Sequence, residues 1–493
     1  MPIERRSITF VPESERHGKV SDQGPFWFLS NFHFFAIAIG FVGPSLGLSL
    51  GFTIIAGTLG ILIGTTFQAF HASQGAELGL PQMIQSRAQF GYRGVIVPLL
   101  ATFVSLVGYN VVATVIVSDG MTALWGFHRN ASAIGISLLA ALLAVWGYDW
   151  LHRVFRILFW VSLPLFTGLS LAILTGHAGG IGTAISTATG SGTIPTPTPL
   201  GFSAIAFLTQ LASAASFNVT AAPYVSDYSR YLPTRTARAA IIFHVFWGSA
   251  LSAIWLIALG AWLATHMGVT DALLALKHAG DALTPGLGTV LAVTSIVALV
   301  ATVGMNAYSA MLTLITTLDS VRQVEPTQKL RIGCIAAITC LWIGVALSFG
   351  GDAITYVNAM LVIMLYCLMP WTAVNLIDYF WLRRGRYSIG DLFTPTGVYG
   401  AWGVRGLSAY ACGIVASIPF FVVPNVYTGP IAARLGGVDI GWLVSLGAAS
   451  VVYVALSRNF DPAREALGQE AAAALDTHRT QGANTARMSA ENS

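Results

Sequence analysis

The chain has 493 residues, of which 55% are hydrophobic and only 9% are charged. A water-soluble globular protein carries roughly 25% charged residues because its surface faces water, so this composition excludes a soluble domain. The net charge of +4 reflects how basic residues divide between the two sides of a membrane, and it does not indicate a nucleic-acid-binding protein.

Apolar stretches long enough to cross a bilayer recur along the whole chain. A hydrocarbon core about 30 Å thick takes roughly 20 apolar residues of helix. Stretches such as Ile242–Leu263 do not alternate between polar and apolar residues, which excludes the strands of a β-barrel. We therefore predict an all-α integral membrane protein with about twelve spans, at 27–51, 53–73, 95–119, 131–148, 154–176, 201–225, 239–265, 287–316, 332–350, 353–380, 407–424 and 438–456.

The ends of the chain and the basic residues predict an orientation. Residues 1–26 lack the apolar core of a cleavable signal peptide and are predicted to form a cytosolic tail. With this end inside, all 25 basic residues except Arg129, Lys277 and Arg434 fall in cytoplasmic segments, as the positive-inside rule requires. We expect a transmembrane domain over 27–456, a second cytosolic tail over 457–493, and a multi-pass protein of the cell membrane.

Two predicted spans contain residues that interrupt helices. The first has Gly40, Gly43 and Pro44 in its middle and second half, and the sixth has Pro223 after a run of small residues. Proline frees backbone groups, which persist in lipid only where they face protein or a wet cavity. Paired breaks of this kind are typical of the central site of a secondary transporter, although glycine and proline also permit close helix packing.

The two interrupted spans lie five spans apart, which predicts an internal repeat. We expect two inverted five-helix repeats, at 27–176 and 201–380, followed by two additional helices within 407–456. The pattern G-x-S-x-G at Gly43–Gly47 matches the nucleophile elbow of hydrolases, but it lies in an apolar helix without the required strand. We therefore predict no enzyme, and regard a channel or a non-transporting membrane protein as remote alternatives.

Three segments resemble the nucleobase:cation symporter-1 family of purine/cytosine permease-like transporters. They are Ala69–Gly94 after the second span, Ser226–Pro233 after the sixth, and Asn306–Ser309 in the eighth. The resemblance covers nearly the whole chain and implies the leucine-transporter-like fold, with helices 1 and 6 broken. It also implies ion-coupled import of a nucleobase of the cytosine, purine or uracil class by alternating access. Allantoin, hydantoin or thiamine are alternative substrates of the same fold.

The resemblance also implies a set of substrate-binding residues. Tyr109 matches an aromatic that stacks on the substrate ring. The second aromatic falls on Phe217 or Asn218, and we favour Phe217 as the ring partner and Asn218 as a neighbouring polar contact. Asn306 matches an asparagine that reads the substrate's amide edge, and backbone near Gly43 supplies further donors and acceptors. Stacking contributes about 1–3 kcal/mol per base, and an amide both donates and accepts. Core packing and interhelical ties are the alternative roles of these side chains.

The coupling ion implied by the resemblance is H⁺ or Na⁺, and no other cofactor is expected. We assign Gly40, Gly43 and Thr302 to ion coupling, because sodium-coupled relatives bring first-span carbonyls to eighth-span hydroxyls. Positions 300 and 301 hold Val and Ala, which offer no side-chain oxygen and favour H⁺. The expected partners are the heterocyclic substrate, the cation and the lipid bilayer, with a monomer and no nucleic acid.

Ionisable residues within or beside the spans are few. Three lie inside predicted spans and are interpreted as structural or interfacial groups rather than proton relays: His33, Asp119 and His244. Four acidic residues lie at cytoplasmic helix ends and are expected to form ion pairs that close an inner gate: Glu77, Asp149, Asp227 and Asp319. Arg87 and Arg230 are the predicted partners.

Overall fold

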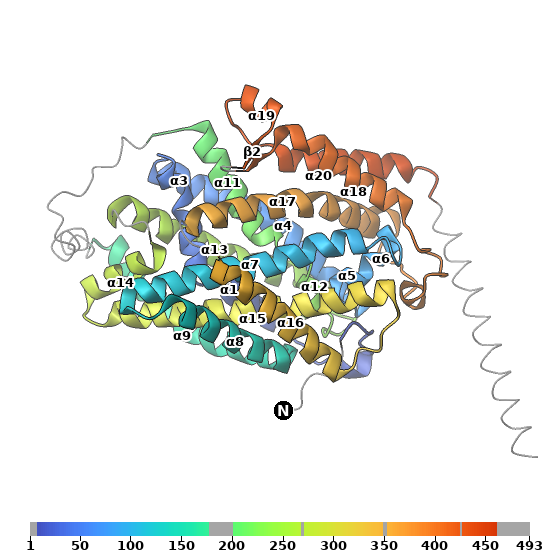
Figure 1. Cartoon of the computed structure of the whole chain (residues 1–493), viewed down its shortest axis with the longest axis horizontal. Helices are drawn as coiled ribbons and strands as arrows, with labels where there is room; N and C mark the ends of the chain where they lie inside the picture. Colours follow the sequence, from blue (N-terminus) through green and yellow to red (C-terminus); the bar gives the residue numbers. More distant parts are fainter. Residues whose placement is uncertain (1–6, 177–200, 268–270, 349–352, 424–425, 461–493) are drawn as a thin grey trace, which may run out of the picture.

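The computed structural model describes all residues except 1–6, 177–200, 268–270, 349–352, 424–425 and 461–493. The described part is a bundle of helices with one small hairpin, β1 (Val422–Val423) paired with β2 (Tyr427–Thr428) (Figure 1). Within it, eight helices are long and apolar enough to cross a membrane. They are α4 (Leu50–Leu78), α7 (Ile96–Trp125), α8 (Arg129–Trp146), α9 (Tyr148–Leu174), α13 (Arg238–Met267), α15 (Leu287–Val321), α16 (Gln328–Ser348) and α17 (Ala353–Ile377), which η3 (Asp378–Leu382) extends.

Shorter helices stand where the other spans are predicted. The first is a bent series of α1 (Val20–Asn31), α2 (Phe34–Gly40) and α3 (Val42–Ser45). The others are α11 (Ala204–Val219), α18 (Val404–Ser417) with η5 (Ile418–Phe420), and α20 (Gly441–Leu456). Connecting segments contain η1 (Glu13–Glu15), α5 (Gln82–Gln85), α6 (Arg87–Phe90), α12 (Val225–Ser229), α14 (Ala272–Leu283), η4 (Gly390–Phe393) and α19 (Pro430–Arg434).

The sharp bend of the first span lies earlier than the sequence predicts. We expected the break around Gly40–Gly43, but the helix axis turns by 60° between Asn31 and Phe34. This bend contains neither glycine nor proline. One freed backbone group is satisfied by another helix, because the Phe34 N–H donates to Ser295 Oγ of α15 at 2.7 Å. The break therefore depends on a tertiary contact.

Glycines instead serve close crossings between two pairs of helices. A Cβ at Gly40 would collide with the Ile257 carbonyl of α13, and one at Gly260 of α13 with a carbonyl of α2. Likewise, a Cβ at Gly60 or Gly64 of α4 would collide with backbone carbonyls of α11. These four positions let helix backbones approach directly, as small residues do in membrane helix interfaces.

The N-terminal tail that precedes the first membrane helix is shorter than predicted. The first helix begins at Val20, not near residue 27. Before it, the Val11 N–H donates to the Gly79 carbonyl and the Gly18 N–H to the Tyr231 carbonyl, each at 2.9 Å. Residues 7–19 therefore lie against the chain that follows α4 and α12.

The sixth span is interrupted around Pro223. Helix α11 ends at Val219, and α12 begins at Val225. Between them the chain makes short-range turns, such as Ala222 N–H to the Val219 carbonyl at 2.9 Å. The interruption agrees with the sequence-based expectation for this span.

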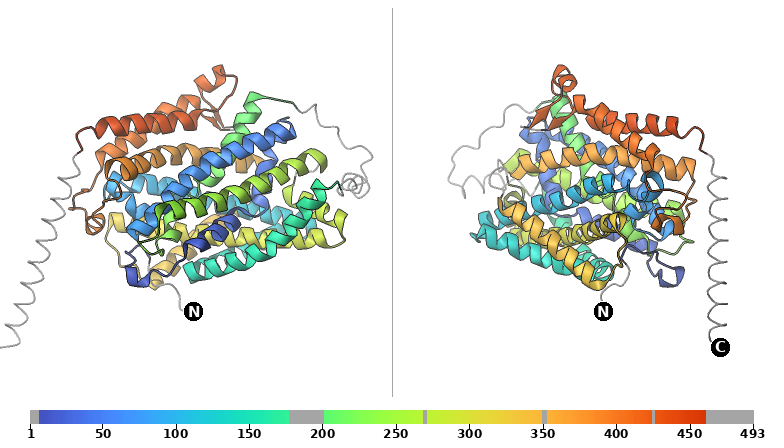
Figure 2. Two further views of the ribbon diagram at one scale, coloured as in Figure 1. Left: turned by 180° about the vertical axis from the view of Figure 1, so that it is seen from behind. Right: turned by 45° about the vertical axis from the view of Figure 1, so that its right-hand side comes forward.

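The contacts between helices come in pairs. If each span in a contact is replaced by the span five positions away in the other half of the chain, the resulting contact is also present. Helix α1 packs on α13 as α11 packs on α4, and α8 packs on α15 as α16 packs on α7. Helix α9 contacts α1 and α15 as α17 contacts α11 and α7. Two structural repeats would produce this pattern, which supports the proposed division into 27–176 and 201–380. Helices α18 and α20 pack together beside α17 (Figures 1 and 2).

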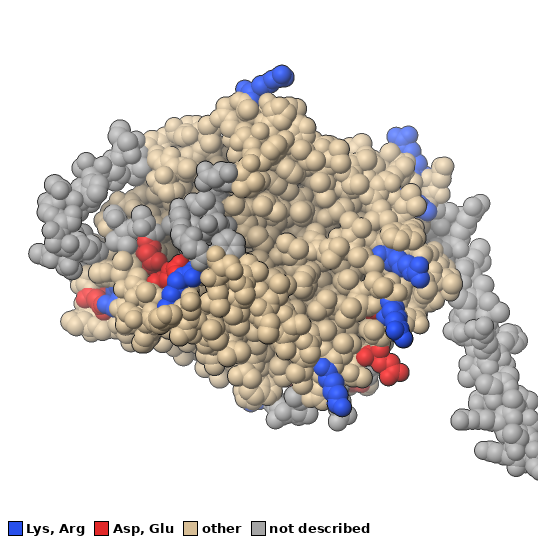
Figure 3. All heavy atoms as spheres, viewed as in Figure 1, with Lys and Arg blue, Asp and Glu red and all other residues tan. Residues whose placement is uncertain are grey.

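The surface has the charge distribution of a membrane protein. Figure 3 shows a broad face without Lys, Arg, Asp or Glu, with charged side chains gathered toward its margins. Many large apolar side chains are exposed on the described helices, including Leu100, Val104, Leu139 and Trp160. Such exposure suits lipid as the surrounding solvent, so the chain is a multi-pass membrane protein.

Candidate functional site

The bend of the first span meets three other helices inside the bundle. Helix α2 begins there, and its first residues contact α15 through Phe34 and both α7 and α11 through Phe35. These are the four spans between which the sequence predicts a substrate, the first, third, sixth and eighth. The site is therefore built around α2 rather than around the glycine-rich end of the first span.

Three aromatic rings form a parallel stack at this point. The Phe35 ring lies 4.8 Å from the Tyr109 ring and 5.8 Å from the Phe217 ring, measured between centroids. The planes are inclined by only 20° and 12°. All three side chains are buried. Tyr109 and Phe217, the two aromatics assigned to the substrate, thus both lie nearly parallel to the Phe35 ring and close to it.

Asn306 supplies an unsatisfied polar group in the same bundle. Its side chain is buried on α15, and Oδ1 accepts no hydrogen bond from the described residues. A buried polar atom left without a partner costs about 1–3 kcal/mol. A bound molecule with an N–H group in reach of Oδ1 would remove that cost. This chemistry fits the predicted role of Asn306.

Asn218 has a different environment from the one predicted. Its Nδ2 donates to Thr65 Oγ1 of α4 at 2.6 Å, and its Oδ1 accepts from Asn31 Nδ2 of α1 at 2.8 Å. Both functions of the amide therefore tie three helices together. The structure does not bring Asn218 into the aromatic stack, and we withdraw it as a substrate contact.

The three residues assigned to ion coupling do not gather at one place. The Gly43 N–H donates to Gln210 Oε1 at 2.7 Å, and Gly40 packs on α13. Thr302 lies at the bend instead, where its hydroxyl donates to the Ser30 carbonyl at 3.3 Å and to the Ala298 carbonyl at 3.2 Å. The first-span carbonyl that meets the eighth span is therefore Ser30, ten residues or more before the predicted glycines.

Phe35 and Ser295 are the residues that sequence reasoning missed. Phe35 stands in a run of apolar residues on the first span, and nothing in the local sequence separates it from Phe34. Ser295 lies seven residues before Thr302, two helical turns away on α15, and is therefore remote from the positions at which the sequence predicts ion-coupling hydroxyls. Only the position of the bend makes either residue recognisable.

The predicted cytoplasmic end of the site is closed by side chains from α12. The Tyr228 hydroxyl donates to the Met305 carbonyl of α15 at 2.9 Å. Its ring lies 4.9 Å from Phe26 of α1 and 5.8 Å from Tyr308 of α15, between centroids. Arg230 Nη2 donates to the Tyr308 hydroxyl at 2.9 Å. A molecule leaving the aromatic stack toward this end would have to displace these groups.

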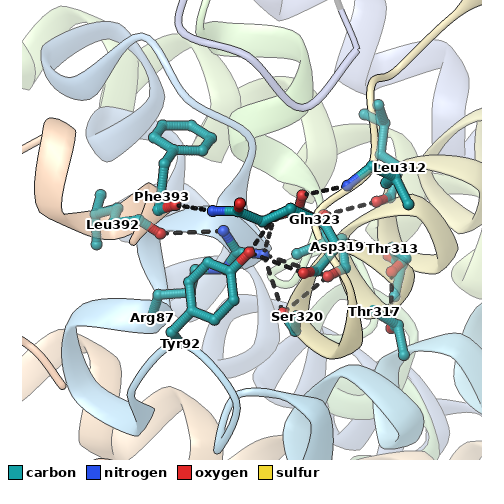
Figure 4. A network of polar contacts seen from close by, with 12 residues as sticks. Arg87, Tyr92, Leu312, Thr313, Thr317, Asp319, Ser320, Gln323, Leu392 and Phe393 are labelled. Atoms are coloured by element: carbon teal, nitrogen blue, oxygen red, sulfur yellow. Dashed lines mark hydrogen bonds and ion pairs between the residues drawn. The ribbon is translucent and has the colours of Figure 1, made fainter. Parts of the chain in front are cut away.

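A buried ion pair reinforces the same end of the bundle (Figure 4). Arg87 Nη2 lies 2.8 Å from Asp319 Oδ2 and donates to Ser320 Oγ at 2.9 Å, while Nη1 donates to the Leu392 carbonyl at 3.0 Å. The Tyr92 ring covers the guanidinium at 4.2 Å. Burial lowers the pKa of Arg87, and the neighbouring Asp319 opposes that shift. The predicted pairing of Arg87 with an acidic helix end is confirmed.

Glu77 and Asp149 have partners different from those predicted. Glu77 pairs with Arg238 at 2.7 Å, and Asp149 lies 3.1 Å from His17. Asp227 accepts from the Gln82 N–H at 3.2 Å. The Arg87–Asp319 pair is buried and joins segments far apart in the sequence, whereas the Glu77–Arg238 and Asp149–His17 pairs are partly or well exposed.

Comparison with known proteins agrees with this architecture. Residues 10–445 match the family model described as permease for cytosine/purines, uracil, thiamine, allantoin. The putative purine-cytosine permease YxlA of Bacillus subtilis (strain 168) is 33% identical over 93% of this chain and 96% of its own. The purine-cytosine permease FCY21 of Saccharomyces cerevisiae is 24% identical over 92% of this chain and 86% of its own.

A solved structure shares the fold. Mhp1, a nucleobase-cation-symport-1 family transporter in a closed conformation with bromovinylhydantoin bound, superposes with a TM-score of 0.70. The match covers 92% of this chain and 94% of Mhp1, at 18% sequence identity. The family match over most of the chain and the close bacterial relative agree with each other. This chain therefore belongs to the family of permeases for cytosine and purines, uracil, thiamine and allantoin.

Proposed function

We propose that this permease imports a nucleobase or a closely related planar N-heterocycle across the cell membrane, coupled to the downhill movement of H⁺ or Na⁺. The observation that carries the proposal is the stacking of Tyr109 and Phe217, the two aromatics assigned to the substrate, on one shared planar ring. A base has the same flat shape and presents two π faces. Stacking on aromatic side chains contributes about 1–3 kcal/mol per base.

We expect two kinds of contact with the substrate, stacking on the faces of its ring and hydrogen bonding at the edge of its ring. The base takes the place of the Phe35 ring, and Asn306 Oδ1 accepts an N–H from its edge. Bases alternate N–H donors with C=O and ring-nitrogen acceptors, so an amide distinguishes their edges by hydrogen bonding. The names of the family and of the relatives, which include purines and cytosine, support this substrate class.

Transport would proceed by alternating access in a single chain. The site lies where two interrupted spans meet, the arrangement found at the centre of transporters built from inverted repeats. Release to the cytoplasm would require Tyr228 to separate from α15, and Arg87 to separate from Asp319 of the same helix. The distribution of basic residues supports a cytoplasmic position for both termini. We propose a monomer that transports its substrate without chemical change.

Uptake of radiolabelled cytosine, uracil and adenine into proteoliposomes tests the proposal. We expect Tyr109→Ala and Asn306→Ala to lose most uptake while each variant still folds and reconstitutes. Tyr427→Ala, a substitution of an exposed tyrosine on β2, is the matched control and should transport normally. Wild-type rates in both site variants would refute the assignment of the site.

A ligand screen separates the substrates within the class. We expect at least one purine, pyrimidine, hydantoin, allantoin or thiamine to raise the thermal unfolding temperature of the purified protein, because a ligand that binds the folded state stabilises it. Hydantoins belong in the screen because Mhp1 was solved with one bound. A screen in which none of these compounds stabilises the protein would contradict the proposed substrate class.

A further inference from the structure

A fully buried histidine stands at the bend of the first span. His33 Nε2 lies 2.9 Å from the Ser30 carbonyl, which can only accept. Nε2 must therefore carry the hydrogen, which leaves Nδ1 as a bare acceptor in the neutral ring. Among the described residues, no donor reaches Nδ1. Buried polar atoms are normally paired, so an unpaired ring nitrogen at this place calls for a functional explanation.

The imidazole contacts the aromatic site directly. Its ring lies 6.3 Å from the Phe35 ring and 6.3 Å from the Phe217 ring, nearly perpendicular to both at 89° and 87°. Through the Ser30 carbonyl it also connects to α15, because the Thr302 hydroxyl donates to the same oxygen. His33 thus joins the bend, the substrate slot and the eighth span.

No permanent charge balances His33 in the contacts of the described residues. Its neighbours are Ser30 on α1, Phe35 on α2 and Phe217 on α11, with Thr302 of α15 on the shared carbonyl. Through the Phe35 ring it is linked to one titratable side chain, Tyr109 of α7. A protonated imidazole would therefore be a buried charge whose new N–H lacks an acceptor, which is costly in a membrane interior.

We infer that His33 carries the coupling proton of this transporter. The inference rests on the proposed function and names its ion. The proton adds to Nδ1, and the resulting N–H donates to a carbonyl oxygen or ring nitrogen of a base standing in place of Phe35. Release of the base to the cytoplasm removes that acceptor, so the proton leaves Nδ1 and the neutral ring is restored.

The arrangement makes proton and substrate bind together. The proton is stabilised by the acceptor on the base, and the base is held by the charged donor. By thermodynamic linkage each must raise the affinity for the other by the same factor. A substituted site that cannot be protonated would still stack the base but would lose this coupling.

The same geometry disfavours a metal cation at the bend. The Ser30 carbonyl already accepts from His33 Nε2–H, and the single hydroxyl hydrogen of Thr302 lies within reach of both this carbonyl and that of Ala298. The Ser295 hydroxyl oxygen accepts from the Phe34 N–H. The oxygen atoms that meet here are thus engaged by donors within the protein, while a ring nitrogen remains open.

Transport into sodium-free proteoliposomes with an imposed pH gradient, acidic outside, tests the inference. We expect wild-type protein to accumulate the transported base at least tenfold above its external concentration, and His33→Gln to lose this accumulation. His33→Gln should retain counterflow exchange of labelled for unlabelled base, which needs no net proton movement. The matched control is His71→Gln, which alters another fully buried histidine, stacked on Trp371 at 4.6 Å, and it should accumulate base normally.

Calorimetry of base binding in buffers of different ionisation enthalpy gives a readout that does not depend on transport. Wild-type protein should take up close to one proton per base bound near neutral pH, and His33→Gln none. If His33→Gln does not fold, proton uptake by the wild-type protein on base binding still tests the inference.

The outcomes separate this inference from the proposed function. Absence of any base binding by wild-type protein overturns the proposed function itself. Base uptake driven by a sodium gradient, base binding without proton uptake, or pH-driven accumulation by His33→Gln overturns the role of His33 alone.

Discussion

Phe35 is the residue that most changes the picture of the site. Its ring stacks on both Tyr109 and Phe217, the two rings on which a substrate ring is expected to stack. The substrate-free site is thereby filled by the protein's own side chain, which removes the cost of an empty apolar gap between two rings. Substrate binding then exchanges one stack for another, and only the difference between the two contributes to affinity.

Truncating this ring should separate its two effects. We expect Phe35→Ala to bind the transported base about tenfold more tightly, because the substrate no longer competes with a stack worth about 1–3 kcal/mol. The same change should lower the stability of the ligand-free protein by about 3–5 kcal/mol, as for other buried Phe→Ala substitutions. Titration of base binding and thermal unfolding measure the two quantities.

The control for this substitution is Phe202→Ala, whose ring is 62% exposed. It should change neither quantity by more than a small amount. Weaker base binding in Phe35→Ala would show instead that the Phe35 ring stacks on the bound substrate.

Individual residues of the site were predictable where a motif specified them. Tyr109, Phe217 and Asn306 were assigned from matches to family segments and stay predictions, and the rings of the two aromatics both stack on Phe35. Asn218 was the alternative match for the second aromatic and was assigned as a polar neighbour of Phe217. On a helix, adjacent residues point about 100° apart, so the neighbour of a site residue faces another helix. Here it faces Thr65 and Asn31.

At the scale of elements, the two broken spans differ in why they break. The sixth contains Pro223, which cannot donate a backbone hydrogen bond, and its interruption was visible in the sequence. The first bends at Phe32–His33, whose residue types are compatible with a continuous helix. Its break is stabilised by Ser295 of another helix. Local sequence contains no information about such a contact, so the prediction fell on the nearby glycines.

The Arg87–Asp319 pair should contribute far more stability than the pairs at the surface. Removing one partner of a buried ion pair costs about 3–5 kcal/mol, whereas exposed pairs contribute about 0–1 kcal/mol. We expect Arg87→Met to lower the thermal unfolding temperature strongly. The matched change Arg238→Met, in a pair whose side chains are 41% and 26% exposed, should have little effect.

A double substitution tests whether the charge pair itself is responsible. Arg87→Met with Asp319→Leu leaves no isolated buried charge and should be more stable than Arg87→Met alone. A double variant as unstable as the sum of its single variants would show that the two residues act independently.

At the scale of the molecule, composition and hydropathy were sufficient for the class of the protein. Eight long apolar helices lie within the described residues, and shorter apolar helices stand at the other predicted positions. The boundaries were less accurate, because polar helix ends such as Val20–Phe26 continue beyond the apolar core that hydropathy detects. The paired contacts of the two halves could be expected only after the repeat was recognised.

The predicted orientation can be measured in intact cells. In a variant whose four native cysteines are replaced, a cysteine at position 434 on α19 should react with a membrane-impermeant maleimide. A cysteine at position 322, after α15, should react only once the membrane is permeabilised. The reverse pattern would place both termini outside the cell.

The glycine crossings have a mechanical consequence. They join α2 to α13 and α4 to α11 without intervening side chains, so these four helices resist sliding and should behave as one stiff block. Phe35 and Phe217 belong to that block, whereas Tyr109 and Asn306 stand on α7 and α15 outside it. Any tilt of the block therefore changes the spacing between Tyr109 and Phe217. The thickness of the bound substrate ring would then limit how far the block can tilt in the substrate-bound protein.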